Sequence, residues 1–144
     1  NSEPDSSWSR ALRMNPRFHE KRDDLALFTT PLMKIDEKNG ATAVKTFGVP
    51  VPPKIIARML ARHGITSQDI TLVAHQSSKS IYEAWNTAIQ PATYITTLED
   101  LGDMVSSSVP VNLAKCYGEI NTKYLVLMGT GMEMHATALL YLRA

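Results

Sequence analysis

The stretch Ile70-Thr71-Leu72-Val73-Ala74-His75-Gln76-Ser77-Ser78 determines how the fold and the site are interpreted. Its first five residues form an apolar run after a polar turn, which is typical of a strand covered on both faces of its sheet. Such a strand delivers His75 at its carboxyl end, the edge where open α/β sheets gather ligands and chemistry. A histidine that is simply satisfied within the core is the alternative, and its position alone leaves both open.

A second segment, Leu101-Gly102-Asp103-Met104-Val105-Ser106-Ser107-Ser108-Val109-Pro110, presents a carboxylate in a tight turn before a predicted helix. Gly-Asp at this place is also a common turn and helix N-cap pair. A histidine and an acid at element ends form half of a nucleophilic or acid–base constellation. The nucleophile is missing, because Cys116 falls mid-helix, away from any strand end or helix N-terminus that would lower its thiol pKa.

The flanking segments predict a layered α/β domain, with a mixed, largely parallel sheet covered by helices. Asn39-Gly40 is a turn signal before a short helix at 41–45. The prolines of Val49–Pro53 interrupt that helix, because proline lacks the backbone donor. Gly129–Gly131 is predicted to end a strand. We expect further helices from Pro53 to the Gly64 stop, over 80–89 and over 105–117, and strands over 70–74, 94–97, 124–128 and 132–142.

Composition narrows the classes of function. The 144 residues fit one domain, with residues 1–38 as an irregular N-terminal segment, a lid over the substrate by position, and 39–144 as the folded part. A net charge of +1 with mostly scattered basic residues gives no case for nucleic acid. One cysteine fits a reducing, cytoplasmic compartment. No apolar run reaches the roughly 20 residues of a membrane span. The start at Asn1 indicates a processed or partial chain.

Taken together, these segments resemble the C-terminal half of a ketoacyl-acyl-carrier-protein synthase III, a thiolase-like condensing enzyme. Where that family has His-Gln-Ala-Asn, this chain has His75-Gln76-Ser77-Ser78. Gly102–Pro110 stands for Gly-Asn-Thr-Ser-Ala-Ala-Ser-Ile-Pro, and Asn39–Lys45 for Asn-Gly-Arg-Glu-Val-Phe-Lys. The family's glycine-rich turn and final strand match Gly129–Gly131 and Thr137–Leu140. The resemblance covers 39–144 in order and implies a thiolase-like half-domain.

The resemblance also implies the partners and the remaining site residues. In that family the nucleophilic cysteine belongs to the N-terminal half, which would reach this chain as a second polypeptide or as the rest of a cleaved precursor. His75 and Asp103 become the catalytic residues, in a dimer of full-length units. Asn39, Gly40 and Ser78 fall where the family binds the thioester and its pantetheine arm. Lys45 matches a residue that docks acyl carrier protein, and a solvated surface lysine is its alternative.

Asp103 departs from the family pattern, which has asparagine here. In decarboxylative condensation the histidine and asparagine donate hydrogen bonds to the thioester carbonyl. An ionised aspartate can only accept, and beside His75 it would fix the imidazole tautomer as in a nucleophile–His–Asp triad. The resemblance then implies acyl transfer from acyl-CoA or acyl carrier protein, through the cysteine, to a hydroxyl or amine.

Two alternatives to acyl transfer stay open. The first is a decarboxylative β-ketoacyl (Claisen) condensing enzyme of fatty-acid or polyketide synthesis, because a protonated Asp103 could still donate a hydrogen bond to the thioester carbonyl. A non-catalytic partner subunit of a heteromeric condensing enzyme is the second. His63 and His135 do not pair with other ligand types at metal spacing, so we expect no metal site. We also expect no redox cofactor, with a coenzyme A or phosphopantetheine thioester entering as substrate.

Overall fold

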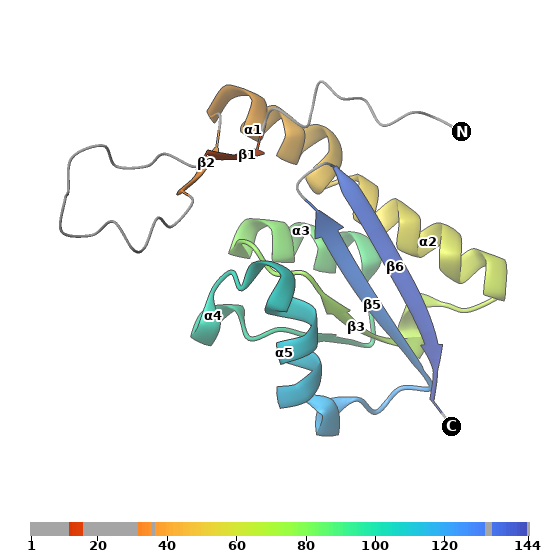
Figure 1. Cartoon of the computed structure of the whole chain (residues 1–144). Coiled ribbons are helices and arrows are strands. Elements are labelled where there is room, and N and C mark those ends of the chain that lie inside the picture. Colours follow the sequence, from red (N-terminus) through yellow and green to blue (C-terminus); the bar gives the residue numbers. More distant parts are fainter. Residues whose placement is uncertain (1–11, 16–31, 36, 132–133, 144) are drawn as a thin grey trace.

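A four-stranded sheet in the order β4-β3-β5-β6 is the centre of the structure (Figure 1). The structure is a computed structural model and describes residues 12–15, 32–35, 37–131 and 134–143. In chain order the elements are β1 (Leu12–Asn15), β2 (Leu32–Ile35), α1 (Glu37–Ala43), a π-helical turn (Val44–Gly48), α2 (Val51–His63), a 3₁₀ turn (Ser67–Asp69), β3 (Ile70–Ala74), α3 (Lys79–Ile89), β4 (Thr93–Ile95), α4 (Leu98–Leu101), a 3₁₀ turn (Val105–Ser107), α5 (Ser108–Lys115), a 3₁₀ turn (Tyr117–Glu119), β5 (Tyr124–Gly131) and β6 (His135–Leu142).

Strand β3 has the bounds that the sequence predicts, and all five of its residues are buried. It pairs in parallel with β4 on one side and with β5 on the other, and β6 runs antiparallel to β5. Enclosure on both edges and both faces explains why four of its five residues are apolar, and the hydroxyl of the fifth, Thr71, is paired with that of Thr122 at 2.8 Å. The predicted mixed, largely parallel sheet is therefore confirmed.

Helices cover the two faces of this sheet unequally. On one face, Ile56 and Leu60 of α2 and Trp85 and Ile89 of α3 pack against alternate residues of β3 and β5. Helix α2 ends at Gly64, whose left-handed φ of 65° suits glycine at a C-cap. The opposite face carries a smaller cluster beneath α5 and the segment after it. The members of this cluster are Val73, Ile95, Ile120, Leu125, Val109, Leu113, Cys116 and Leu127.

Strand β6 has one face that is largely exposed. Leu139 pairs with Leu127 and Tyr141 with Leu125, so their side chains lie on the α5 side of the sheet. Yet Leu139 is 57% exposed and Tyr141 58%. Helix α5 packs on β3 and β5, and it leaves this part of β6 uncovered (Figure 1).

The predicted Asn39-Gly40 turn is wrong, because both residues lie inside α1. Gly40 is buried, and burial of a helix face outweighs the local turn preference of the dipeptide. The predicted break between the helices at Val49–Pro53 is present, but it ends at Pro50. Helix α2 begins at Val51 and accommodates both following prolines in its first turn, where their missing N–H groups have no helical partner to lose.

Other differences concern element ends. Strand β5 continues through Gly131 because β6 pairs with it as far as His135, so Gly129–Gly131 does not end the strand. The predicted helix over 105–117 is divided into a 3₁₀ turn, α5 and a second 3₁₀ turn, and the short α4 before it was not predicted. The start predicted for the last strand at Met132 lies outside the described residues.

In the N-terminal segment the described residues form one antiparallel pair, Leu12–Asn15 with Leu32–Ile35. The prediction of irregular structure is wrong for these two strands. The rest of residues 1–38, apart from 37 and 38 at the start of α1, lies outside the described residues, so the predicted lid stays a prediction.

Candidate active site

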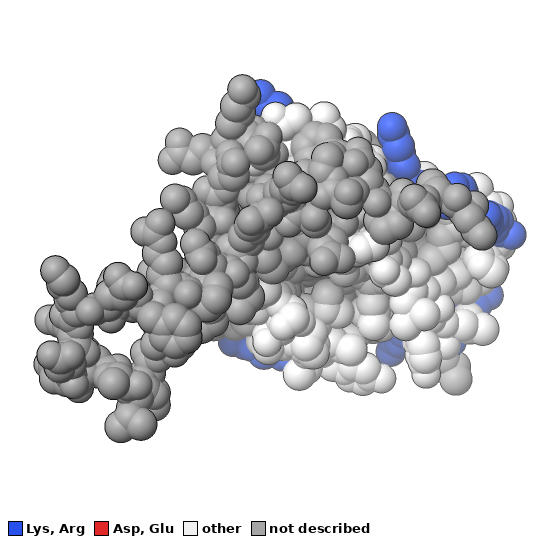
Figure 2. Space-filling model, turned by 45° about the horizontal axis from the view of Figure 1, so that its top comes forward, with Lys and Arg blue, Asp and Glu red and all other residues white. Residues whose placement is uncertain are grey.

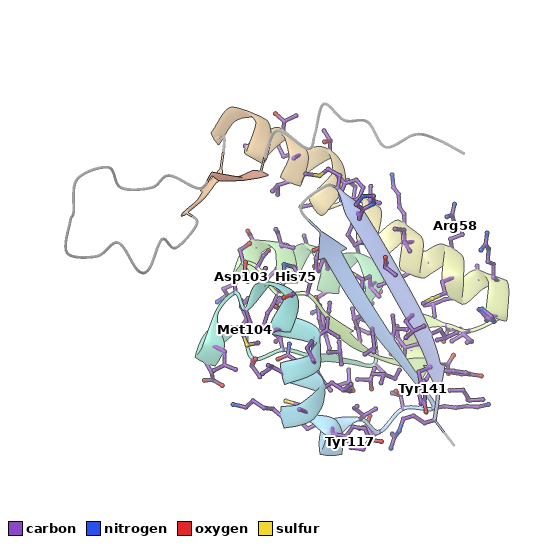
Figure 3. All side chains as sticks on the ribbon, in the orientation of Figure 1. Arg58, His75, Asp103, Met104, Tyr117 and Tyr141 are labelled. Carbon is purple, nitrogen blue, oxygen red and sulfur yellow. The ribbon has the colours of Figure 1, made fainter. Side chains whose placement is uncertain are left out.

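His75 lies one residue beyond β3, at the carboxyl edge where the sequence predicts it. Its backbone N–H donates to the carbonyl of Met128 at 2.8 Å, which extends the sheet pairing past the end of the strand. The residue is half-buried. Figure 3 shows His75 and Asp103 at the same end of the sheet, near the start of α5. The sheet therefore fixes the backbone from which the imidazole projects.

The imidazole of His75 has a single described partner, which defines its tautomer. Nδ1 lies 3.1 Å from the carbonyl oxygen of Val105. A carbonyl oxygen can only accept, so Nδ1 must carry the hydrogen. In neutral imidazole Nε2 then holds a lone pair. This arrangement presents a base, rather than a neutral hydrogen-bond donor, on the side of the ring away from Val105.

Asp103 bonds to the backbone N–H of Val105, the residue whose carbonyl faces His75. Its Oδ1 accepts the backbone N–H of Val105 at 2.7 Å, and the carboxylate is exposed. The sequence predicts that this carboxylate fixes the imidazole directly. In the structure Val105 lies between Asp103 and His75, and the carbonyl of Val105, not the carboxylate, contacts the imidazole. The two predicted residues are brought together, but through the backbone of a third.

Val105 adopts a backbone conformation that its side chain disfavours. Its φ is 51°, in the left-handed region, where a β-branched residue is an outlier. Four hydrogen bonds oppose this strain, and one of them runs from the backbone N–H of Ser108 to the Val105 carbonyl oxygen. The other three involve side chains. Asp103 accepts from the Val105 N–H, and the Val105 carbonyl oxygen lies 3.1 Å from Nδ1 of His75 and 2.9 Å from Oγ of Ser108, which donates to it. Strain maintained in this way is concentrated at functional sites.

Sequence reasoning missed a buried polar network beneath this turn. Gln76 is almost fully buried, with 4% exposed. Its side-chain amide bonds to Thr96 and Thr97 between β4 and α4, to Gly102 after α4 and to Asn112 in α5. Asn112 and Thr97 are also buried, and Oγ1 of Thr97 donates to Oδ1 of Asn112 at 2.6 Å. The one signal in the sequence is an amide directly after His75 at the end of a buried strand.

The other predicted site residues lie apart from this network. Oγ of Ser78 accepts the N–H of Ile81 at 3.4 Å, so it caps α3. Asn39 and Gly40 belong to α1, and Lys45 is an exposed residue of the π-helical turn. No described contact joins any of these four residues to His75. Their roles toward a thioester or a carrier protein stay predictions.

Cys116 does not have the surroundings of a nucleophile. Burial, and then the hydrogen bond and charge of Glu119, raise the pKa of its thiol above the ordinary value, against a smaller effect of Lys115. It lies at the C-terminal end of α5 and packs in the cluster beneath that helix. A raised pKa reduces the thiolate fraction at neutral pH, as expected of an inert thiol.

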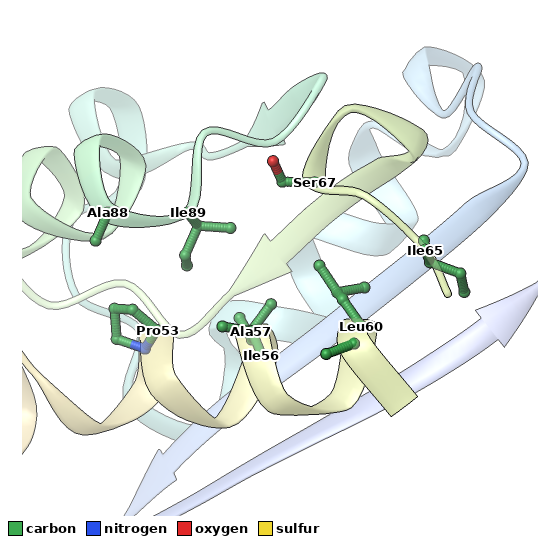
Figure 4. Close-up of a pocket in the computed structure, with 9 residues that line it drawn as sticks. Pro53, Ile56, Ala57, Leu60, Ile65, Ser67, Ala88 and Ile89 are labelled. Atoms are coloured by element: carbon green, nitrogen blue, oxygen red, sulfur yellow. The ribbon is translucent and has the colours of Figure 1, made fainter. Parts of the chain in front are cut away.

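An apolar cavity of about 270 Å³ lies between α2 and α3 and is distinct from this site (Figure 4). Its wall includes Ile65 and Ser67, which precede β3, whereas His75 follows the other end of that strand. On the face shown in Figure 2, the Lys and Arg side chains lie at several separate places, which agrees with their scatter along the sequence. Neither feature contributes to the arrangement around His75.

The described part of the chain has neither a cluster of metal-ligand side chains nor a membrane-spanning helix. Within residues 12–15, 32–35, 37–131 and 134–143, no three His, Cys, Asp or Glu side chains gather as metal ligands would. No helix in the described part of the chain combines the length and the apolar character that crossing a membrane requires.

A histidine at the carboxyl edge of a mixed sheet, facing a turn that opens a covering helix, agrees with the thiolase-like α/β half-domain that the sequence resemblance implies. Residues 60–141 match the family described as "3-Oxoacyl-[acyl-carrier-protein (ACP)] synthase III C terminal". This match spans more than half of the chain, so the chain belongs to that family. The resemblance seen in the sequence is confirmed. No curated protein sequence matches the chain.

Solved structures share the fold at low sequence identity. 3-Oxoacyl-(acyl carrier protein) synthase III, FabH, from Pseudomonas aeruginosa PAO1 has a TM-score of 0.76 and 19% identity, over 97% of this chain and 43% of that one. The synthase III from Thermus thermophilus gives 0.74 and 17%, over 99% and 44%. OleA from Xanthomonas campestris gives 0.70 and 17%, over 98% and 37%. The chain thus spans less than half the length of each.

Proposed function

We propose that this chain is the C-terminal half of a ketoacyl synthase III-like acyltransferase. An acyl group from acyl-CoA or an acyl-carrier-protein thioester would be loaded on a cysteine of an N-terminal half. It would then pass to a hydroxyl or amine acceptor. Family membership and the shared fold support the general chemistry of this proposal. The geometry around His75 supports the choice of acyl transfer.

The observation that carries the proposal is the 3.1 Å contact between Nδ1 of His75 and the carbonyl of Val105. Because the hydrogen is on Nδ1, the lone pair of Nε2 is available to remove a proton from the acceptor. Stabilising a thioester oxyanion by a neutral imidazole would need the opposite tautomer, with the hydrogen on Nε2.

Nε2 of His75 takes the proton of the acceptor O–H or N–H as the acceptor atom attacks the thioester carbonyl carbon. The carbon–sulfur bond then breaks, and its electron pair leaves with the cysteine sulfur. The imidazolium returns the proton to that sulfur, so His75 serves as base and then as acid. The proposal needs no metal or redox cofactor, and coenzyme A or phosphopantetheine carries the acyl substrate.

Asp103 has a positioning role in this proposal. Its Oδ1 holds the N–H of Val105, and the second carboxylate oxygen adds negative charge to the turn facing His75. An ionised carboxylate has no hydrogen with which to bind a thioester carbonyl. Asp103 would therefore favour the imidazolium formed during transfer, while Val105 selects the tautomer.

Decarboxylative condensation is the second candidate, and a specific observation favours it. The matching family and the FabH structures are described as 3-oxoacyl-acyl-carrier-protein synthases. If His75 acts as imidazolium, both ring nitrogens donate, and Nε2 could stabilise an enolate. Substitution of Asp103 separates the two candidates. In Asp103→Asn the amide oxygen can keep the bond to Val105 while the amide N–H₂ supplies a donor.

The experiment combines the chain with its N-terminal half and supplies an acyl thioester with an alcohol or amine. We expect His75→Ala to lower acyl transfer by about 10²–10⁴-fold, the usual contribution of a general base. The matched control is His63→Ala, an exposed histidine at the end of α2, which should leave the rate unchanged. Unchanged transfer in His75→Ala contradicts the proposal.

The Asp103→Asn variant then identifies the reaction. Acyl transfer predicts a lower rate to the acceptor and no release of CO₂ from malonyl thioester. A condensing enzyme predicts release of CO₂ at least equal to that of the unchanged protein. If neither activity appears and substitutions of His75 and Asp103 alter only stability, the chain is a non-catalytic partner subunit.

The remaining predicted roles complete the proposal. Asn39, Gly40 and Ser78 would hold the thioester arm, Lys45 would dock the carrier protein, and full-length units would form a dimer in the cytoplasm. Lys45→Glu should raise KM for acyl carrier protein and leave KM for acyl-CoA unchanged. Lys54→Glu, another exposed lysine, is the control. Equal effects of the two substitutions contradict a specific docking role for Lys45.

A further inference from the structure

Gln76 is a buried polar side chain to which the proposed reaction assigns no role. Only 4% of it is exposed, although it directly follows His75. Within the described residues its amide makes hydrogen bonds from both ends. Nε2 donates to the carbonyl of Gly102 at 2.7 Å, and Oε1 accepts from Nδ2 of Asn112 at 2.8 Å. A buried amide with both ends engaged favours one arrangement of the surrounding backbone.

The bond from Nε2 of Gln76 to the Gly102 carbonyl holds the first residue of the turn that leads to Val105. Gly102 has a φ of 66°, and Val105, three residues later, has a φ of 51°. The short segment between them therefore has a residue with a positive φ at each end. Nε2 of Gln76 holds Gly102 from the core side of the turn, because it donates to the Gly102 carbonyl. A displacement of Gly102 would move the Val105 carbonyl with it.

The acceptor end of Gln76 ties the same turn to two neighbouring elements. Oε1 accepts the backbone N–H of Thr97, which precedes α4, at 3.2 Å. It also accepts from Asn112, which lies in α5. The turn at 102–105 connects α4 to the 3₁₀ turn before α5. One side chain thus joins the end of β3 to both helices that flank the turn.

A second link runs through the backbone of Gln76. Oγ of Ser108 lies 2.9 Å from the carbonyl oxygen of Val105, to which it donates, and 3.5 Å from the carbonyl oxygen of Gln76. Ser108 is fully buried. The Val105 carbonyl is therefore located from two directions, through Gly102 and through Ser108. The side chain of Gln76 acts through Gly102, whereas the Ser108 route includes only its backbone carbonyl, and the backbone N–H of Ser108 also donates to the Val105 carbonyl.

We propose that Gln76 is a positioning residue that sets the tautomer of His75. It does so by holding the Val105 carbonyl against Nδ1, so that Nε2 keeps its lone pair. The catalytic consequence rests on the proposed function, whereas the tautomer is a property of this chain. Asp103 contributes to the same turn from the solvent side, and Gln76 contributes from the core.

The substitution that isolates this role is Gln76→Glu, because it keeps the shape and the acceptor oxygen but replaces the Nε2 donor to Gly102. The matched control is Gln68→Glu. Nε2 of Gln68 donates to the backbone carbonyl of Gln90, also at 2.7 Å, before the opposite end of β3. Both variants lose the same kind of bond, and only one lies beneath the turn that faces His75.

The measurement is ¹⁵N NMR of the histidine ring nitrogens in the complete protein, at a pH where the imidazole is neutral. We expect His75 to be mainly Nδ1–H in the unchanged protein and in Gln68→Glu. In Gln76→Glu the ratio of Nδ1–H to Nε2–H should fall about tenfold, the factor associated with loss of one hydrogen bond. An Nε2–H majority in the unchanged protein, or an unaltered ratio in Gln76→Glu, overturns the proposal.

A second measurement covers the case in which Gln76→Glu does not fold. In the unchanged protein the side-chain amide protons of Gln76 should exchange with solvent at least 10²-fold more slowly than those of the exposed Gln68. Equal exchange would show that the bond to Gly102 does not persist, which also overturns the proposal.

Activity distinguishes this inference from the proposed function. In the assembled enzyme Gln76→Glu should lower kcat and leave KM for the acyl thioester unchanged, because the binding residues are untouched. If the unchanged protein transfers no acyl group but the tautomer depends on Gln76, only the proposed function fails. If transfer occurs and the tautomer ignores Gln76, only this inference fails.

Discussion

Replacement of Val105 by glycine measures the backbone strain in the turn that faces His75. Val105 is a β-branched residue at φ 51°, a conformation that glycine adopts without penalty. The substitution also removes a side chain that is 53% exposed, so little packing is lost with it. The matched control is Val44→Gly, because Val44 is 41% exposed but lies in a helical turn.

The expected magnitudes follow from the two environments. Left-handed backbone costs an ordinary residue about 1–2 kcal/mol, which Val105→Gly recovers. Against this, the greater freedom of glycine in the unfolded chain costs about 0.5–1 kcal/mol. The loss of a half-buried valine side chain costs about 0.7 kcal/mol more. These terms nearly cancel, so we expect a change within about 0.5 kcal/mol of zero. In Val44→Gly only the two losses remain, which together are about 1.2–1.7 kcal/mol.

The assay is urea denaturation of both variants, compared at a common m value. Val44→Gly should lower the midpoint clearly, and Val105→Gly should leave it nearly unchanged. Val105→Asn adds a further test, since asparagine tolerates the left-handed region without the full freedom of glycine, and it should be at least as stable as the unchanged protein. Equal destabilisation by the two glycine substitutions would refute strain at Val105.

Three further predictions concern stability and its pH dependence. Trp85→Phe should lower the free energy of unfolding by about 1–3 kcal/mol in denaturant titration, because the buried indole N–H donates to a main-chain carbonyl at 3.0 Å. Burial, and then Tyr82, raise the pKa of Tyr94, so stability should fall as the pH rises above the ordinary tyrosine value near 10. Tyr94→Phe should remove this alkaline loss, and thermal melts at pH 9 and pH 11 would measure it. Hydrogen bonds from Thr66 lower the pKa of Asp69. The contribution of Asp69 to the free energy of unfolding should therefore be present above about pH 4 and be lost as the pH falls below that value. Thermal melts of Asp69→Asn should lack this dependence on pH.

The parts of the fold that the sequence predicts well are those in which local pattern and burial agree. Strand β3 is enclosed and apolar except for Thr71, whose hydroxyl is paired with that of Thr122, and its bounds are those that the sequence predicts. Helix α2 follows its apolar stripe to Gly64. Where the local sequence pattern and burial favour different structures, burial decides which one forms. Gly40 is buried within α1, and Gly129 is held in β5 by pairing with Thr137, although glycine favours a turn at both places.

For the candidate site, the sequence predicts positions better than contacts. Strand order alone places His75 at the carboxyl edge, and the turn pattern places Asp103 near it. The intervening backbone of Val105 could not be predicted, because its left-handed φ is supported in part by a bond to His75, which is distant in the sequence. The same holds for Gln76, whose amide partners come from three separate segments.

The hydrogen bond from the His75 amide to Met128 has a practical consequence for protein engineering. It attaches the backbone of His75 to the sheet, so the position of this backbone does not depend on the exposed loops. The turn at 102–105 contacts the imidazole itself, so surface loops other than this turn are the ones to exchange when acceptor choice is redesigned.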